Sequence, residues 1–363
     1  MKAVGMKAMR IIMILGFSLI FLLHTPAQER RKSDHFDGKK FFNPTLTEKS
    51  PGFSDAFRMM REGGRAKWPK KVENLGVARL NENLGTDGMA ITFVNHATFL
   101  IQLPGLNILT DPVWAKRVSP VRWFGPKRVR APGVKLEELP KIDVIVISHN
   151  HYDHLDTKTL KKLNKLYSPK VIVPVGDKDL IESIGIKNVV ELDWWEGVQI
   201  NSDTYITFTP TQHSSQRGLF DRNKSLWGSY FIRHKERSVY FGGDSGYSTH
   251  YAEIRKRLGS PEIALLGIGA YLPRWFMKAI HMDPAEAVVA HKDLGAKLSI
   301  GMHYGTFQLS SEGFEQPLTD LKAALEKENV SPDSFITLPE GETRIYGVQK
   351  NDQTIEKPGS SPD

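Results

Sequence analysis

The sequence predicts an α/β domain in which β-sheets are covered by helices. Short apolar runs rich in β-branched and aromatic residues, typical of strands, recur from about residue 88 onward. Segments with helical patterning lie between some of them, so strands predominate and helices are interspersed. Several of the apolar runs end at a histidine or an aspartate, which is where α/β domains usually place their ligand sites. The 363 residues, 40% apolar and 25% charged, suffice for one large domain or two ordinary ones with a sizeable core.

The first 27 residues indicate a targeting segment. Lys2, Lys7 and Arg10 precede the apolar run 11–23, and small residues at 25–27 suit cleavage after Ala27, as in a secretory signal peptide. The run is shorter than the roughly 20 residues that span a bilayer, but an uncleaved membrane anchor is the alternative. We therefore expect an exported protein, periplasmic or associated with the cell envelope. Cleavage would lower the formal charge from +8 to +5, which suits anionic lipid surfaces and gives no reason to expect nucleic-acid binding.

Residues 28–87 are expected to form an N-terminal extension packed on the domain. Within it, Phe53, Phe57 and Met60 recur at helical spacing beside basic residues. This pattern is typical of a surface helix, and the alternative is a basic amphipathic element that contacts a membrane. Residues 88–347 are the expected catalytic domain, and residues 348–363 an expected disordered tail.

Within the catalytic domain, the apolar runs predict strands in the order 89–103, 106–114, 142–148, 170–175, 204–211, 229–234, 238–244, 262–270 and 297–305. Helical patterning predicts helices over 155–167, 177–184, 247–258, 283–294 and 315–328. No internal repeat is present.

The stretch "SHNHYDHLD" (148–156) follows one of these strands and is dense in metal-ligating groups. His149 and His151 are two residues apart, so in an extended segment both point the same way. Asp153 and His154 come next, just before a predicted helix. One ion cannot readily use all four groups, whereas two ions about 3.5–4 Å apart could share them. The chain has no cysteine, so a metal site must use histidine and carboxylate.

Three isolated residues at other strand ends offer further ligands. His213 follows the run 204–211, Asp244 follows two glycines that permit close backbone approach, and His303 follows the run 297–302. Each alone is more often a structural or surface residue than a ligand. Together with the histidine-rich stretch they indicate a two-metal site.

The order HxHxDH, lone His, lone Asp and lone His resembles the dinuclear zinc set of the metallo-β-lactamase superfamily. The segments "ELDWWE", "NKSLWGS", "GDSGY", "IGAYLPRWFMK" and "HMDPAEAV" are similar to N-acylphosphatidylethanolamine-hydrolysing phospholipase D and its bacterial relatives, over about residues 88–346. The resemblance implies an αββα sandwich, with two central mixed sheets flanked by helices. It also implies two Zn²⁺ per chain. One would be held by His149, His151 and His213, the second by Asp153, His154 and His303, with Asp244 bridging both.

The implied activity is that of a zinc-dependent phosphodiesterase of the phospholipase D type. It would hydrolyse N-acyl-phosphatidylethanolamine or a similar phospholipid to N-acylethanolamine and phosphatidic acid by attack of a metal-bridged hydroxide. Zinc makes hydroxide available because it lowers the pKa of bound water to about 7. The same nucleophile attacks carbonyl carbon, so a dinuclear-zinc hydrolase of lactones, β-lactams or other esters and amides is the alternative. A non-catalytic zinc-binding envelope protein is a third hypothesis.

The expected partners are a phospholipid substrate and, peripherally, a membrane surface, with no nucleic acid; a homodimer stays open. The segment 120–135 joins basic residues to Trp123 and Phe124, which suits either a solvated loop or a lipid-facing patch. Trp194 and Trp195 are expected in the core, and the alternative is an aromatic surface that faces lipid. Gln216 stands where we associate a basic residue with bile-acid contact in animal relatives, so regulation of that kind is not expected.

Further roles follow from the resemblance. It implies that Tyr152 and His281 contact the substrate and that His281 and Asp244 are catalytic. The alternatives are a packed aromatic ring at Tyr152 and, at His281, either a helix-capping group or a residue that supports the metal ligands. His96 is expected to be a structural histidine rather than a ligand, and Asp111 is expected to support the site by hydrogen bonding or to turn the chain.

Overall fold

The computed structural model describes residues 32–46, 52, 55, 58, 61, 64–80, 82–121 and 123–347. The expected signal peptide, the expected tail and the helical positions Phe53, Phe57 and Met60 lie outside the described residues. Among the helices that are described, none combines the length and apolar character needed to cross a bilayer.

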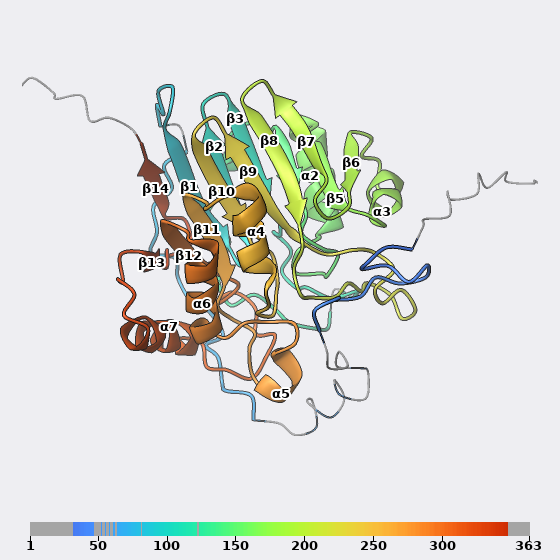
Figure 1. Ribbon diagram of the computed structural model, residues 1–363, viewed down its shortest axis with the longest axis vertical. Helices are drawn as coiled ribbons and strands as arrows, with labels where there is room; N and C mark the ends of the chain where they lie inside the picture. Colours follow the sequence, from blue (N-terminus) through green and yellow to red (C-terminus); the bar gives the residue numbers. More distant parts are fainter. Residues whose placement is uncertain are drawn as a thin grey trace, which may run out of the picture.

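Two seven-stranded mixed sheets face each other (Figure 1), which confirms the αββα sandwich. The first sheet has the order β14 (Thr343–Tyr346), β1 (Met89–Asn95), β2 (Thr98–Leu103), β3 (Leu106–Thr110), β4 (Val144–Val146), β5 (Lys170–Pro174) and β6 (Val189–Leu192). The second has the order β13 (Phe335–Ile336), β12 (Leu298–Met302), β11 (Ile263–Gly267), β10 (Arg237–Phe241), β9 (Ser229–His234), β8 (Thr204–Thr209) and β7 (Gly197–Asn201). Strands β3–β6 and strands β10–β13 are parallel, and the other neighbours are antiparallel.

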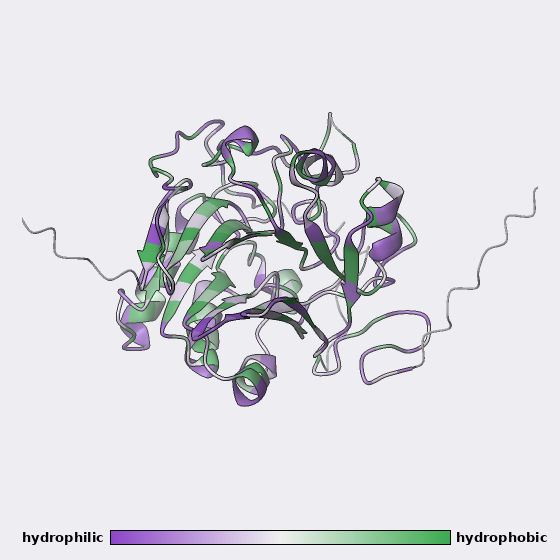
Figure 2. Ribbon diagram, turned by 90° about the horizontal axis from the view of Figure 1, so that it is seen from above, coloured by the Kyte–Doolittle hydropathy of each residue, from purple (hydrophilic) through white to green (hydrophobic). Residues whose placement is uncertain are grey.

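The core lies between the two sheets. Phe93 and Phe99 from the first sheet and Phe208, Tyr230 and Phe241 from the second are fully buried in one cluster. Each such aromatic side chain contributes about 1.5–3 kcal/mol to folding when it leaves water. Figure 2 shows the two sheets facing each other, with apolar residues along the strands of both and helices on the outer sides.

The helices begin and end within three residues of the predicted ranges. They are α2 (Thr157–Tyr167), α3 (Lys178–Ser183), α4 (His250–Leu258), α6 (Pro284–Leu294) and α7 (Gln316–Lys327), besides the short α5 (Arg274–Met277) and a 3₁₀ turn, Leu136–Glu138. Local signals explain two of the starts. Asp156 caps α2 by accepting from the backbone N–H groups of Lys158 and Thr159. Asp283 and Glu286 form a capping box ahead of α6.

The four strands that the sequence did not predict are the four edges of the two sheets: β6, β14, β7 and β13. An edge strand has a partner on one side only, so it needs no continuous apolar run. β7 shows this, since all five of its residues are partly or fully exposed. Of the two indoles at 194–195, Trp194 is buried as expected, while Trp195 is half-buried beneath the Arg257 guanidinium.

Candidate metal centre

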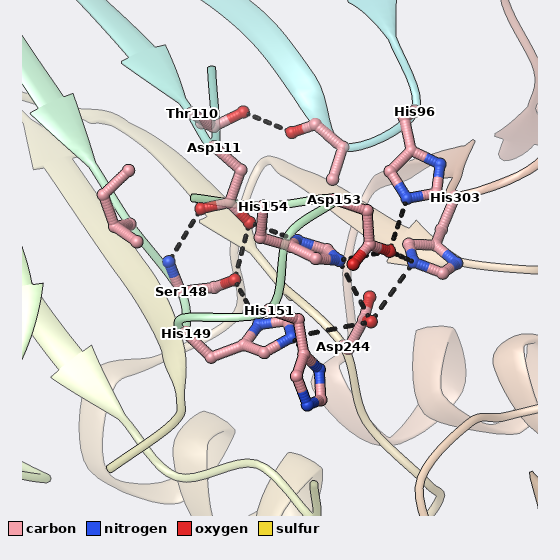
Figure 3. Close-up of polar contacts among 12 residues, drawn as sticks. His96, Thr110, Asp111, Ser148, His149, His151, Asp153, His154, Asp244 and His303 are labelled. Atoms are coloured by element: carbon pink, nitrogen blue, oxygen red, sulfur yellow. Dashed lines mark hydrogen bonds and ion pairs between the residues drawn. The ribbon is translucent and has the colours of Figure 1, made fainter. Parts of the chain in front are cut away.

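The predicted ligands meet where strands of both sheets end. The loop 147–156 follows β4, His213 follows β8, Asp244 follows β10 and His303 follows β12. Figure 3 shows the side chains of the loop, Asp244 and His303 converging onto one centre. A close approach makes this possible, because a Cβ on Gly243 would lie 2.7 Å from the Ser148 Cβ.

Three histidines form the first group. His149 Nε2 lies 2.9 Å from His151 Nδ1, and His213 Nε2 lies 3.3 Å from the same atom. The far nitrogens of two rings are held by the protein: His149 Nδ1 hydrogen-bonds Ser148 Oγ at 2.9 Å, and His213 Nδ1 donates to the carbonyl of Ile280 at 2.9 Å. These bonds aim both Nε2 atoms at the centre.

The second group surrounds the carboxylate of Asp153. Its Oδ2 lies 3.4 Å from His154 Nε2 and 3.3 Å from His303 Nε2. His96 Nε2 also lies near this oxygen, at 3.0 Å, and the His96 ring packs against that of His303 in a tilted arrangement, with centroids 4.0 Å apart. The ligand atoms of His96, Asp153, His154 and His303 all lie within 4.8 Å of one another, so these four residues could hold one metal ion.

Asp244 lies between the two groups. Its Oδ2 is 3.1 Å from His154 Nε2 and 3.2 Å from His303 Nε2. Three more imidazole nitrogens lie within 3.8–3.9 Å of this oxygen, from His213, His149 and His281. One carboxylate thus faces both groups, as a bridging ligand must.

Asp111 orders the ligands from behind, as expected from its sequence. Its Oδ1 accepts from the backbone N–H of Ser148 at 2.7 Å, and its Oδ2 accepts from Ser148 Oγ and from His154 Nδ1, both at 2.6 Å. Ser148 Oγ has one proton, and because it donates this to Asp111 it must accept from His149 Nδ1. One carboxylate oxygen therefore fixes the Nδ1 proton of both His149 and His154, so Nε2 is the nitrogen of each ring that a metal could bind.

The backbone at the centre is held in an unusual conformation. His96, Asp111 and His303 all have positive φ angles, of 48°, 32° and 62°. Such conformations cost about 1–3 kcal/mol each for residues other than glycine and cluster at functional sites.

The charges of the centre fall into two classes. Burial lowers the pKa of His151 to about 4 and that of His213 to about 3, and it lowers the pKa of His149 as well, so these rings are neutral with free lone pairs. Burial also disfavours charge on His303, but Asp244 and Asp153 raise its pKa to about 9. The pKa of His154 is raised for the same reason.

A metal cation fits this distribution. In the metal-free form, protons on His154 and His303 neutralise the buried carboxylates of Asp153 and Asp244, whose pKa values these histidines lower despite burial. Buried His154 Nε2, His303 Nε2 and Asp244 Oδ1 have no hydrogen-bond partner. A cation would replace the protons and satisfy these atoms. Imidazole and carboxylate ligands suit zinc and several other transition metals.

His281 lies beside the centre, and Tyr152 belongs to the loop between His151 and Asp153. The Tyr152 hydroxyl donates to the carbonyl of Arg217 at 2.9 Å, and the Arg217 guanidinium lies 4.1 Å from its ring centroid. The His281 ring lies 5.1 Å from that of His213. The capping alternative for His281 is wrong, since Asp283 caps α6. The roles of both residues toward a substrate stay predictions.

The sequence left Asn150 and Asp156 of the histidine-rich stretch without a role. Asn150 Nδ2 donates to Asp177 Oδ1 at 2.9 Å, which ties the loop to the residue that precedes α3. Asp156 Oδ2 accepts from the backbone N–H of Ala115 at 3.0 Å, in addition to capping α2. These partners lie 27 and 41 positions away, so spacing alone could not reveal them.

Asp177 gives the protein a pH-dependent stability. Burial raises its pKa to about 7, so the folded chain keeps a proton that the unfolded chain releases above about pH 4. The free energy of unfolding should therefore fall as pH rises from about 4 to about 7. Relative to wild type, Asp177→Asn is expected to gain about 3 kcal/mol between pH 4.5 and pH 7.5. Urea unfolding of both proteins across this range measures it, and a constant difference would contradict the assignment.

Comparison with known proteins identifies the class to which this fold and centre belong. The beta-lactamase superfamily domain matches residues 106–304. A metallo-β-lactamase fold protein from Bacillus subtilis superposes with a TM-score of 0.50 at 17% identity, over 71% of this chain and 99% of that one, which supports the fold. The chain belongs to the metallo-β-lactamase superfamily.

Two relatives narrow the class. The chain is 38% identical to N-acyl-phosphatidylethanolamine-hydrolyzing phospholipase D 1 of Caenorhabditis elegans, over 84% of this chain and 92% of the relative. It is 41% identical to the mitochondrial N-acyl-phosphatidylethanolamine-hydrolyzing phospholipase D of Saccharomyces cerevisiae, over 61% of this chain and 48% of that protein. The protein is a metal-dependent hydrolase related to these phospholipases D.

Proposed function

We propose that the protein is a dinuclear-zinc phosphodiesterase that hydrolyses N-acyl-phosphatidylethanolamine or a similar phospholipid to an N-acylethanolamine and phosphatidic acid. The observation that carries the proposal is the complete set of seven candidate metal ligands, Asp244 and six others. The chain is 38% identical, over most of its length, to a phospholipase D named for this substrate. The segment 1–27 supports export as part of the proposal.

The side chains of the centre would have two kinds of role, metal binding and substrate contact. His149, His151 and His213 would hold one zinc ion, and Asp153, His154 and His303 the other, with Asp244 shared. When bound, zinc supplies a Lewis acid for the phosphodiester and makes water a nucleophile at neutral pH. Neutral His281, whose pKa burial lowers to about 3, presents one N–H and one lone pair beside the centre. It would hydrogen-bond the substrate phosphate and assist proton transfer to the leaving oxygen.

Exposed apolar side chains near the centre support a membrane-bound substrate. Trp123 and Phe124 are exposed on a loop that follows Val118. Val118 is buried and packs with Tyr152 and Phe307. Leu219 and Phe220 follow Arg217, whose carbonyl and guanidinium hold Tyr152. These four residues are among the most exposed large apolar side chains of the described chain. Exposed apolar side chains of this kind suit insertion between lipid headgroups.

A substrate panel tests the proposal. Zinc-loaded protein would be assayed on vesicles containing N-acyl-phosphatidylethanolamine, on a lactone and on a β-lactam, each with and without chelator. We expect chelator-sensitive release of N-acylethanolamine from the vesicles and slower turnover of the other two compounds. Inert vesicles would refute the proposed substrate, and rapid lactone or β-lactam turnover together with inert vesicles would favour the carbonyl hydrolase instead.

A further inference from the structure

We propose that Asn43, in the N-terminal extension, is a positioning residue that fixes the metal ligand His213. The inference rests on the proposed role of His213 in the first zinc site. Asn43 lies outside residues 106–304, which match the superfamily domain, and it precedes the first strand of the two sheets, β1.

The Asn43 side chain forms hydrogen bonds with both the carbonyl and the N–H group of His213. Asn43 Nδ2 donates to the carbonyl of His213 at 2.8 Å, and the His213 N–H donates to Asn43 Oδ1 at 3.1 Å. The same Oδ1 accepts from Trp227 Nε1 at 3.1 Å, which fixes the orientation of the amide. A side-chain amide thus pairs with His213 as a neighbouring strand would.

His213 needs such a partner because it lies beyond the end of its strand. The ladder between β8 and β9 stops at Thr209, and the next pairing is the isolated bridge between Gln212 and Gly246. On the side away from the centre, the His213 ring is held by the hydrogen bond from its Nδ1 to the Ile280 carbonyl. Two fixed points define the direction of Nε2: this bond at the ring, and Asn43 at the backbone.

The extension is itself anchored firmly enough to act as a support. Phe36 and Phe41 are buried in the main core cluster, and the Phe41 N–H donates to the carbonyl of Asn223 at 2.8 Å. The His35 ring stacks on Trp194 with centroids 4.4 Å apart. In Figure 1 this blue segment runs beside the yellow-green loop that follows β8.

The test measures metal affinity directly, without substrate. Metal-free wild type, Asn43→Ala, Asn43→Ser and His213→Ala would be titrated with Zn²⁺ against a chelating dye and with Co²⁺, whose visible absorption reports coordination geometry. Asn74→Ala is the matched control, since Asn74 lies in the same extension and also donates to a carbonyl, that of Ala131 at 3.0 Å. Unfolding temperatures of the metal-free proteins identify variants that fail to fold.

We expect Asn43→Ala to weaken one of the two metal sites about 10–100-fold and to change the Co²⁺ spectrum, as loss of a group that orients a ligand usually does. Asn43→Ser, which keeps a small polar group, should fold and weaken the same site, and Asn74→Ala should match wild type. If both Asn43 variants bind metal like wild type while His213→Ala loses a site, the inference is wrong and the proposed ligand set stands. If His213→Ala also binds metal like wild type, His213 is not a metal ligand, and both the proposed ligand set and the inference are wrong.

Discussion

Replacing Asp244 with alanine is expected to reduce hydrolysis at least about 10³-fold, because the variant loses the carboxylate that we propose both metal sites share. A metal ion contributes several kcal/mol to transition-state stabilisation, and each 1.36 kcal/mol changes the rate tenfold. Asp244 Oδ2 lies within 3.1–3.9 Å of five imidazole nitrogens, so its loss also leaves His154 and His303 without a counter-charge. The bound metal per chain should fall in parallel with the rate.

The control for this variant is an aspartate that has no such neighbours. Asp203 pairs with Lys235 at 3.8 Å on the surface, where an ion pair contributes little, so Asp203→Ala should keep wild-type activity and metal content. Activity within tenfold of wild type in Asp244→Ala would contradict the shared role of Asp244.

Replacing Asp111 with asparagine is expected to weaken metal binding about 10–100-fold, although the new side chain has the same shape. Asp111 Oδ2 accepts from both Ser148 Oγ and His154 Nδ1, whereas an amide nitrogen at that position donates. His154 would then carry its proton on Nε2, the atom that must bind the metal. Turning the amide over brings no relief, because its nitrogen would then face the Ser148 N–H.

Ser148→Ala distinguishes the two links of Asp111, through Ser148 to His149 and directly to His154. It breaks the link from Asp111 to His149 and leaves the bond from Asp111 to His154, so the loss of affinity should be smaller than in Asp111→Asn. Metal titration and unfolding temperature would be measured for both. Wild-type metal affinity in Asp111→Asn would show that the carboxylate does not set the histidine tautomers.

The residues of the candidate metal centre could be grouped from the sequence because their signals are local. His149, His151, Asp153 and His154 are concentrated in one loop, and His213, Asp244 and His303 each follow an apolar run that forms a strand. The carboxyl ends of such strands meet at one edge of a sandwich, so residues far apart in the chain could be grouped before the structure was known. Asp111 could be assigned a supporting role for the same reason.

The residues that the sequence did not reveal depend on tertiary pairing. Asn43 contacts His213 across 170 positions, and Asp177 contacts Asn150 across 27. Each is an ordinary polar residue in its local sequence, and only the folded chain gives it a partner. The four edge strands were missed for a related reason, since their strand conformation comes from one neighbouring strand rather than from an apolar run of their own.

The most direct test of the central claim is to quantify metal and hydrolysis in the same preparations. Purified protein, protein stripped by chelator and protein reloaded with Zn²⁺ would be compared by elemental analysis and by release of N-acylethanolamine from vesicles. We predict two zinc ions per chain in the active protein, loss of activity with the metal, and its return on reloading. Full activity in stripped protein with far less than one metal ion per chain would contradict the account.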